Sequence, residues 1–278
     1  MIAFARRHPI WTAVLLIVAA VLLWMIFALW PKWLVLLIGR KKVFLSALFN
    51  GITLGALYFL VASGFTLIFG LMRNVNLAHG SLYLMGGYIG FEVAEATGYW
   101  LIAFPVAFLL VGAVGVALQV LVFRRMEGQD LRQTLVTIGI SIVLADLMLW
   151  GWGGDFYQVQ TPTWLSGPLE TILVTAQKRS GALVYLKYPL VRVVIFLAAV
   201  AIGIAMWLLL NRTRVGMLIR AGVDDRDMLS ATGVRIQLVF AGVFAFGAGL
   251  AGLAGVVGGT FQALAPGEDV RFLLYSLI

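Results

Sequence analysis

Long apolar segments dominate the chain, and they constrain its fold more than any other feature. The first, "IWTAVLLIVAAVLLWMIFALW" at residues 10–30, is apolar apart from Thr12. A helix rises about 1.5 Å per residue, so this segment covers the roughly 30 Å of bilayer hydrocarbon. Further apolar segments follow at residues 43–72, 82–96, 100–123, 135–152, 191–210 and 238–261. Because backbone polar groups must be paired inside lipid, the pattern predicts an all-α, polytopic transmembrane helical bundle.

The composition supports a membrane protein and argues against several other classes. Hydrophobic residues make up 62% of the chain and charged residues 12%, about half of the roughly 25% typical of soluble domains. The chain has no cysteine and two histidines, so we expect no disulfide, no thiol chemistry and no metal site. The net charge of the chain is +8. In a polytopic membrane protein, such an excess of basic residues usually lies in cytoplasmic loops that face anionic lipid. We therefore expect membrane lipid as a partner, and no nucleic acid.

The distribution of basic residues predicts an orientation for the C-terminal part of the chain. Residues 211–235 contain five arginines, whereas residues 153–188, where we expect turns at a wet interface, contain three basic side chains. The former should be cytoplasmic, on the same side as the arginines at 124, 125 and 132. The topology of residues 1–98 stays open, because segment 82–96 either crosses the membrane or re-enters. We interpret residues 10–30 as a retained anchor rather than a cleaved signal.

Polar residues crowd into one short stretch, "NVNLAHGSLYLMGGY", at residues 74–88. Irregular backbone at membrane depth requires burial in protein or contact with a watery cavity. We therefore predict a broken or re-entrant segment here that faces the interior of the bundle, with glycines allowing close packing or a helix break. A short packed loop, with the histidine hydrogen-bonded to a carbonyl, is the open alternative. The candidate path residues are Asn74, Asn76, His79, Gly80, Ser81 and Gly86.

Two further interpretations of polar residues in the membrane need testing. An intramembrane hydrolase would use Ser81 as nucleophile and His79 as base, although no G-x-S-x-G motif surrounds the serine. Asp146 is the one clear intramembrane carboxylate in the pattern, and we expect it to pair with Arg192 or to mark a polar pathway.

The arginine-rich connection "NRTRVGMLIRAGVDDRDMLSATGVR" predicts a small helical projection between two spans. The acidic residues Asp224, Asp225 and Asp227 should open a helix, and Gly233 should end it. In the last complete span, small residues at spacing four (Gly247, Ala251, Gly255 and Gly259) form a ridge for close helix packing. That packing is either within the chain or at a subunit interface.

At these places the sequence resembles the membrane permeases of branched-chain amino acid ABC importers. The stretch "FNGITLGALYFLVASGFTLIFGLMRNVNLAHGSLYLMGGY" is similar to the opening region of the family, with its N-x-A-H-G signature. "TLVTIGISIVLADLMLWGWGGDFYQV" resembles the middle span, in which an uncharged residue is expected where Asp146 stands. "VGMLIRAGVDDRDMLSATGV" resembles the loop that engages the ATPase, with matches at Gly216, Arg220, Ala221, Asp225, Asp227 and Gly233.

The resemblance covers about residues 49–278 and implies a permease domain over residues 43–278, preceded by an extra N-terminal transmembrane segment and linker at residues 1–42. Since chains of the family continue further, we expect this one to be truncated at its C-terminus. The resemblance implies a multi-pass permease of the inner (plasma) membrane that works by alternating access. Its expected partners are ABC ATPase subunits, a second permease subunit and an extracytoplasmic substrate-binding protein.

The residues themselves exclude a P-loop, because no lysine in the chain is followed by serine or threonine. We therefore expect no enzymatic activity and no cofactor in this chain, with ATP bound by the partner ATPase. Permeases of the same architecture for urea, amides or sugars are the alternative within transport, and a channel is a further one.

Overall fold

The computed structural model describes residues 41–72, 75–126, 128–177 and 183–277, so the expected N-terminal anchor lies outside the described residues. Within the described part, five helices are long and apolar enough to cross a membrane. They are α4 (Lys41–Met72), α6 (Trp100–Leu121), α7 (Asp130–Trp152), α8 (Leu190–Arg212) and α11 (Ile236–Phe261). Each coincides with a predicted apolar segment, which confirms an all-α polytopic bundle.

Shorter elements connect these helices. They are α5 (His79–Thr97), the 3-10 helix η2 (Phe123–Met126), α9 (Arg214–Asp224), α10 (Arg226–Ala231) and α12 (Glu268–Leu277). Strands β1 (Pro168–Gln177) and β2 (Leu183–Pro189) pair into a two-stranded sheet, where we had expected only turns. Glycines in the left-handed region end two of the helices, with φ of 71° at Gly98 after α5 and 72° at Gly153 after α7.

The chain divides into two compact units, which we describe separately. The smaller unit contains the start of α4 and most of the two-stranded sheet. Within it, the hydroxyl of Tyr188 donates a hydrogen bond to the carbonyl of Phe49 at 2.8 Å, and the two rings lie 5.4 Å apart. These contacts attach β2 to the first turns of α4.

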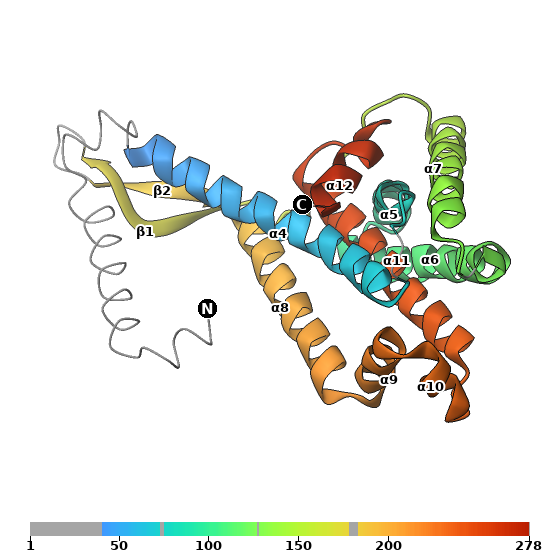
Figure 1. The fold of residues 1–278 in the computed structure, drawn as a ribbon. Coiled ribbons are helices and arrows are strands. Elements are labelled where there is room, and N and C mark those ends of the chain that lie inside the picture. The colour runs from blue at the N-terminus through green and yellow to red at the C-terminus, as the bar shows by residue number, and fades with distance from the viewer. Residues whose placement is uncertain (1–40, 73–74, 127, 178–182, 278) are drawn as a thin grey trace, which may run out of the picture. The chain divides into compact units, whose positions relative to one another are not determined.

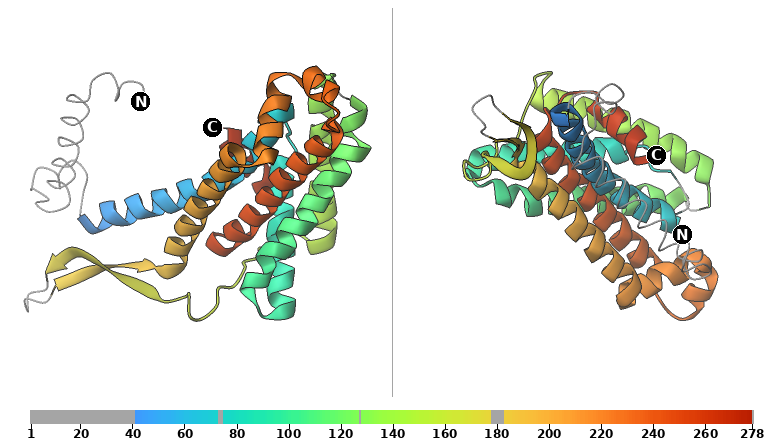
Figure 2. Two further views of the ribbon diagram at one scale, coloured as in Figure 1. Left: turned by 90° about the horizontal axis from the view of Figure 1, so that it is seen from below. Right: turned by 90° about the vertical axis from the view of Figure 1, so that its left-hand side faces the viewer.

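The larger unit, residues 52–169 and 189–278, is organised around α5. Helices α6, α7, α11 and α12 all contact α5 (Figure 1), and α11 also packs along α6. Figure 2 shows the same helices from two further sides. The core between them contains fully buried aromatic side chains, those of Tyr83, Tyr88, Phe123, Phe244 and Phe272. Helix α5 is therefore a core element that positions its polar N-terminus inside the protein.

The small-residue ridge of α11 packs within the chain. A Cβ atom on Gly255 would overlap the carbonyl oxygen of Tyr83 on α5, and one on Gly247 would lie 2.8 Å from the carbonyl oxygen of Gly64 on α4. On α5, a Cβ atom on Gly86 would overlap the backbone of Gly252 on α11. Such close backbone approach is how helices associate in a bilayer, where apolar side chains gain little by leaving lipid. Of the two alternatives for the ridge, the structure supports intrachain packing.

Candidate functional site

The predicted helix break lies between α4 and α5 and is shorter than we expected. Helix α4 ends at Met72 and α5 begins at His79, so most of residues 74–88 is regular helix. Asn76 closes the turn, because its side-chain oxygen accepts a hydrogen bond from the amide of Ala78 at 3.1 Å. From α7, the hydroxyl oxygen of Thr137 accepts from the amide of Leu77 at 3.0 Å. These side chains satisfy backbone groups that the break leaves unpaired. Asn74 lies outside the described residues.

The glycines of this stretch serve helix packing rather than breaking the helix. Gly80 and Gly86 are both buried within α5. A Cβ atom on Gly80 would overlap the carbonyl oxygen of Asp269 and lie 2.9 Å from Cβ of Leu273, both on α12. Of the two roles expected for these glycines, the structure supports close packing, because α11 and α12 approach so closely that only hydrogen atoms fit at these positions.

His79 is fully buried at the first turn of α5. Its Nε2 lies 3.1 Å from the carbonyl oxygen of Val61 on α4. Because a carbonyl can only accept, Nε2 carries the proton and Nδ1 is the acceptor of the neutral ring. Within the described structure, Nδ1 of His79 and Nδ2 of Asn76 make no hydrogen bond although both are buried. Such atoms usually find a partner, so these two are among the few buried polar side-chain atoms of the described structure that lack one.

Ser81 belongs to a polar cluster that also contains the buried Asp269 and the half-buried Ser141. Its hydroxyl donates to Oδ2 of Asp269 at 3.0 Å and lies 2.9 Å from the hydroxyl of Ser141 on α7. Asp269, in the first turn of α12, is only 4% exposed. Because His79 binds Val61 and Ser81 binds Asp269, the two residues do not form the base and nucleophile pair that a hydrolase requires.

The expected pairing of Asp146 with Arg192 is wrong, and a different carboxylate is buried. Asp146 is exposed on α7, and it forms no ion pair with Arg192 among the described residues. The guanidinium of Arg192 instead lies 5.1 Å from the ring centre of Phe261. The sequence did not predict that Asp269 is buried. It follows a Pro-Gly turn near the end of the sequence, where no apolar periodicity indicates which side chains are buried.

The arginine-rich connection folds as the two short helices α9 and α10. Thr213 precedes α9, and its hydroxyl accepts a hydrogen bond from the amide of Gly216 at 3.1 Å. A Cβ atom on Gly216 would overlap the carbonyl oxygens of Leu209 and Leu210, so the chain can turn out of α8 this tightly only with glycine. The predicted helical projection is confirmed.

We had expected the acidic run to open a single helix, but it lies across the end of one helix and the start of the next. Asp224 is the last residue of α9, and Asp225 precedes α10, where its Oδ1 accepts from the amide of Met228 at 2.9 Å. Gly233 follows α10 with φ of 84°, as predicted for a helix end. Asp227 lies in α10, but its side chain is outside the described part of the structure.

One buried side chain anchors the projection. Ile219 on α9 is 5% exposed and packs with Leu67 on α4 and with Phe240 and Val243 on α11. Arg220 on the same helix donates to the side-chain oxygen of Asn211 at 3.2 Å, and the carbonyl of Ala221 accepts from the amide of Asp225 at 3.0 Å. The projection is therefore attached to three long apolar helices, α4, α8 and α11.

The hydrogen bond of Asp225 predicts that its role in α10 is capping. We expect Asp225→Ala to destabilise α10 by about 1 kcal/mol, whereas Asp225→Asn should be nearly neutral because asparagine caps about as well. Hydrogen exchange at the amides of residues 226–231 measures this, with exchange about fivefold faster in the alanine variant. Equal acceleration in both variants would show that the charge, rather than the cap, is needed.

Comparisons with known proteins show which family the chain belongs to. Residues 47–278 match the family described as "Branched-chain amino acid transport system / permease component". The permease protein LivH of the high-affinity branched-chain amino acid transport system of Escherichia coli K12 is 30% identical over 231 residues, which cover 80% of this chain and 72% of LivH. The corresponding BraD of Pseudomonas aeruginosa is 28% identical over 235 residues, covering 81% of this chain and 74% of BraD. No solved structure matches the chain.

The family match extends from the second turn of α4 through the helix break, the projection and α12, and so includes every candidate site described above. Its relatives are named as permeases of transport systems rather than as enzymes. Together with the five apolar helices, this makes the chain a multi-pass inner-membrane transport protein that belongs to the family of branched-chain amino acid transport system permeases.

Proposed function

We propose that this chain is the permease subunit of an ATP-driven importer for branched-chain or other hydrophobic amino acids, working by alternating access. The similarity to LivH and BraD supports the substrate class. No lysine in the sequence is followed by serine or threonine, as a P-loop requires, and this supports ATP hydrolysis by separate ATPase subunits. The complete importer would also contain a second permease subunit and an extracytoplasmic binding protein that delivers the substrate.

The observation that carries this proposal is the anchored projection of α9 and α10. Val215, Met217 and Met228 on these helices are 52%, 57% and 69% exposed. They present apolar side chains on a structure that Ile219 fixes to α4 and α11. Exposed methionine suits an interface that must adapt to a moving partner. We assign the ATPase docking surface to the exposed side chains of this projection, together with Gly216, Arg220, Ala221, Asp225, Asp227 and Gly233.

The translocation path would run beside the α4–α5 break. Two buried atoms there, on Asn76 and His79, make no hydrogen bond within the described structure, and the Ser81 cluster holds a buried carboxylate beside them. Polar groups at membrane depth are costly unless they serve a pathway. In an alternating-access cycle, these groups would be covered in one conformation and meet water or substrate in another.

Reconstitution in liposomes tests the proposal. We expect the chain, together with its ATPase, second permease subunit and binding protein, to take up leucine only when ATP is supplied. The chain purified alone should hydrolyse no ATP. ATP hydrolysis that follows this polypeptide through purification would contradict the assignment, and leucine flux without nucleotide would indicate a channel. Urea or an amide that abolishes leucine uptake by competition would favour the alternative substrates.

A further inference from the structure

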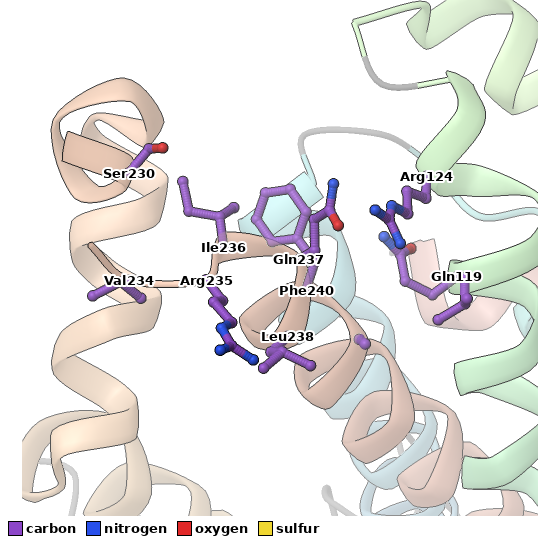
Figure 3. Close-up of a pocket in the computed structure, with 11 residues that line it drawn as sticks. Gln119, Arg124, Ser230, Val234, Arg235, Ile236, Gln237, Leu238 and Phe240 are labelled. Atoms are coloured by element: carbon purple, nitrogen blue, oxygen red, sulfur yellow. The ribbon is translucent and has the colours of Figure 1, made fainter. Parts of the chain in front are cut away.

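A pocket at the junction of α6, η2 and the start of α11 is not used by the proposed transport cycle. Its volume is about 620 Å³, within the range of about 300–1,000 Å³ usual for ligand sites. Gln119 and Arg124 line one wall, and Arg235, Gln237 and Leu238 line the other (Figure 3). All of these residues belong to the larger compact unit.

The pocket is positively charged without compensation. Arg124 and Arg235 both line it, and none of its lining residues is aspartate or glutamate. Both arginines are exposed, and neither forms an ion pair with a described residue. Two guanidinium groups around one cavity favour an anion with several acceptor oxygens, such as a phosphate group.

One wall offers a further polar group. Gln119 is only 2% exposed, and its side-chain oxygen makes no hydrogen bond within the described residues. A buried acceptor of this kind requires a donor. A phosphodiester supplies none, so the ligand that fits best carries a hydroxyl group next to its phosphate.

The mouth of the pocket continues onto an apolar surface. Val120 on α6 is 42% exposed and Leu238 on α11 is 65% exposed, and both line the pocket. Both helices are long and apolar enough to cross the membrane. The arginine distribution places their charged ends on the cytoplasmic side. The anionic group of a ligand here would lie among the arginines, and its apolar part would lie against side chains that face lipid.

From these observations we infer that the pocket is a specific binding site for an anionic phospholipid with a hydroxylated headgroup, of the phosphatidylglycerol type, in the cytoplasmic leaflet. The phosphate binds at Arg124, a headgroup hydroxyl donates to the neighbouring Gln119, Arg235 adds positive charge on the opposite wall, and the acyl chains follow Val120 and Leu238. Basic pockets between helices at this membrane surface suit such lipids. The site adjoins α10 through Ser230, so a bound lipid would brace the base of the projection.

Native mass spectrometry of the full chain tests this inference. The purified protein is incubated with dioleoyl-phosphatidylglycerol, with dioleoyl-phosphatidylcholine or with inorganic phosphate, and bound species are counted. We expect preferential retention of phosphatidylglycerol. The double variant R124Q/R235Q should lower its apparent affinity about thirtyfold, because each of the two arginines contributes about 1 kcal/mol and about 1.4 kcal/mol corresponds to a factor of ten.

A matched control removes the same charge outside the pocket. Arg125 and Arg214 are exposed and cytoplasmic by the same argument, but they do not line the pocket. R125Q/R214Q should change phosphatidylglycerol binding by no more than about twofold, because exposed charges that do not contact the bound lipid are screened and contribute little. The variant A241F, which fills the cavity from α11 without altering charge, should lose the lipid as R124Q/R235Q does, and it keeps the test available if the arginine variant misfolds.

Three outcomes would overturn the inference. Equal losses in the two double variants would indicate only general attraction to a basic surface. Inorganic phosphate bound as well as phosphatidylglycerol would indicate a free anion as the ligand. If R124Q/R235Q keeps its lipid but loses co-purification of the ATPase, the pocket is a protein contact.

Discussion

Replacing Gly86 by leucine should remove folded permease from the membrane. A Cβ atom at this position overlaps the backbone of Gly252, and backbone cannot rotate away as a flexible side chain can. Overpacking of a core costs about 1–3 kcal/mol and more where nothing can move, and about 1.4 kcal/mol already corresponds to a tenfold change. We therefore expect the monodisperse peak in size-exclusion chromatography of solubilised membranes to fall about tenfold or more.

Gly139 provides the matched control for this substitution. It lies in α7, another long apolar helix, and a Cβ atom there would meet nothing within 4 Å. Gly139→Leu should leave the peak unchanged, since the added side chain enters open space. A Gly86→Leu protein as abundant and monodisperse as the unmodified protein would show that α5 and α11 do not pack this closely.

Replacing Gly216 by leucine should separate folding from transport. The new side chain overlaps the carbonyl oxygens of Leu209 and Leu210, so α9 must turn away from α8. That movement withdraws Ile219 from its contacts with α4 and α11. Because α9 lies outside the five long apolar helices, we expect normal amounts in the membrane. ATP-driven leucine uptake and co-purification of the ATPase should each fall about tenfold or more, since losing about 1.4 kcal/mol of coupling has that effect.

Two companion variants identify the cause. Met217→Arg changes an exposed side chain of the projection without disturbing its attachment, and it should weaken ATPase binding in the same assay. Gly242→Leu adds the same side chain as Gly216→Leu at a site in α11 where a Cβ atom meets nothing within 4 Å, and it should leave uptake unchanged. Full ATP-driven uptake by Gly216→Leu would refute the docking assignment.

Residue types predicted the presence of the helix break but not its length. Asn76 beside His79, in a run of apolar residues, predicted an interruption because such residues cap and turn the backbone. The length of the interruption depended on α11 and α12, whose backbones lie against Gly86 and Gly80. A glycine in a sequence is compatible with a break and with a close helix contact. Only the position of the neighbouring helix distinguishes the two.

The carboxylates also show that the sequence alone does not reveal which side chains are buried. Asp146 stands in an apolar segment and attracted attention, yet its side chain is exposed, while Asp269 is buried and bonded to Ser81. These partners are separated by 188 positions in the chain. Local composition reports which residues can cross lipid, but it carries no information about contacts between such distant segments.

What the sequence alone determined is the membrane-spanning character, the bounds of the long helices to within a few residues and the helical nature of the projection. Each of these follows from local physics, namely the cost of unpaired backbone groups in lipid and the preferences of capping residues. Tertiary structure alone decided that α5 is a core helix, that the α11 ridge packs internally, and that Arg124 and Arg235 share a pocket. The physical reason is that these features arise from contacts between helices, and in lipid such contacts depend on shape and backbone approach rather than on hydrophobicity.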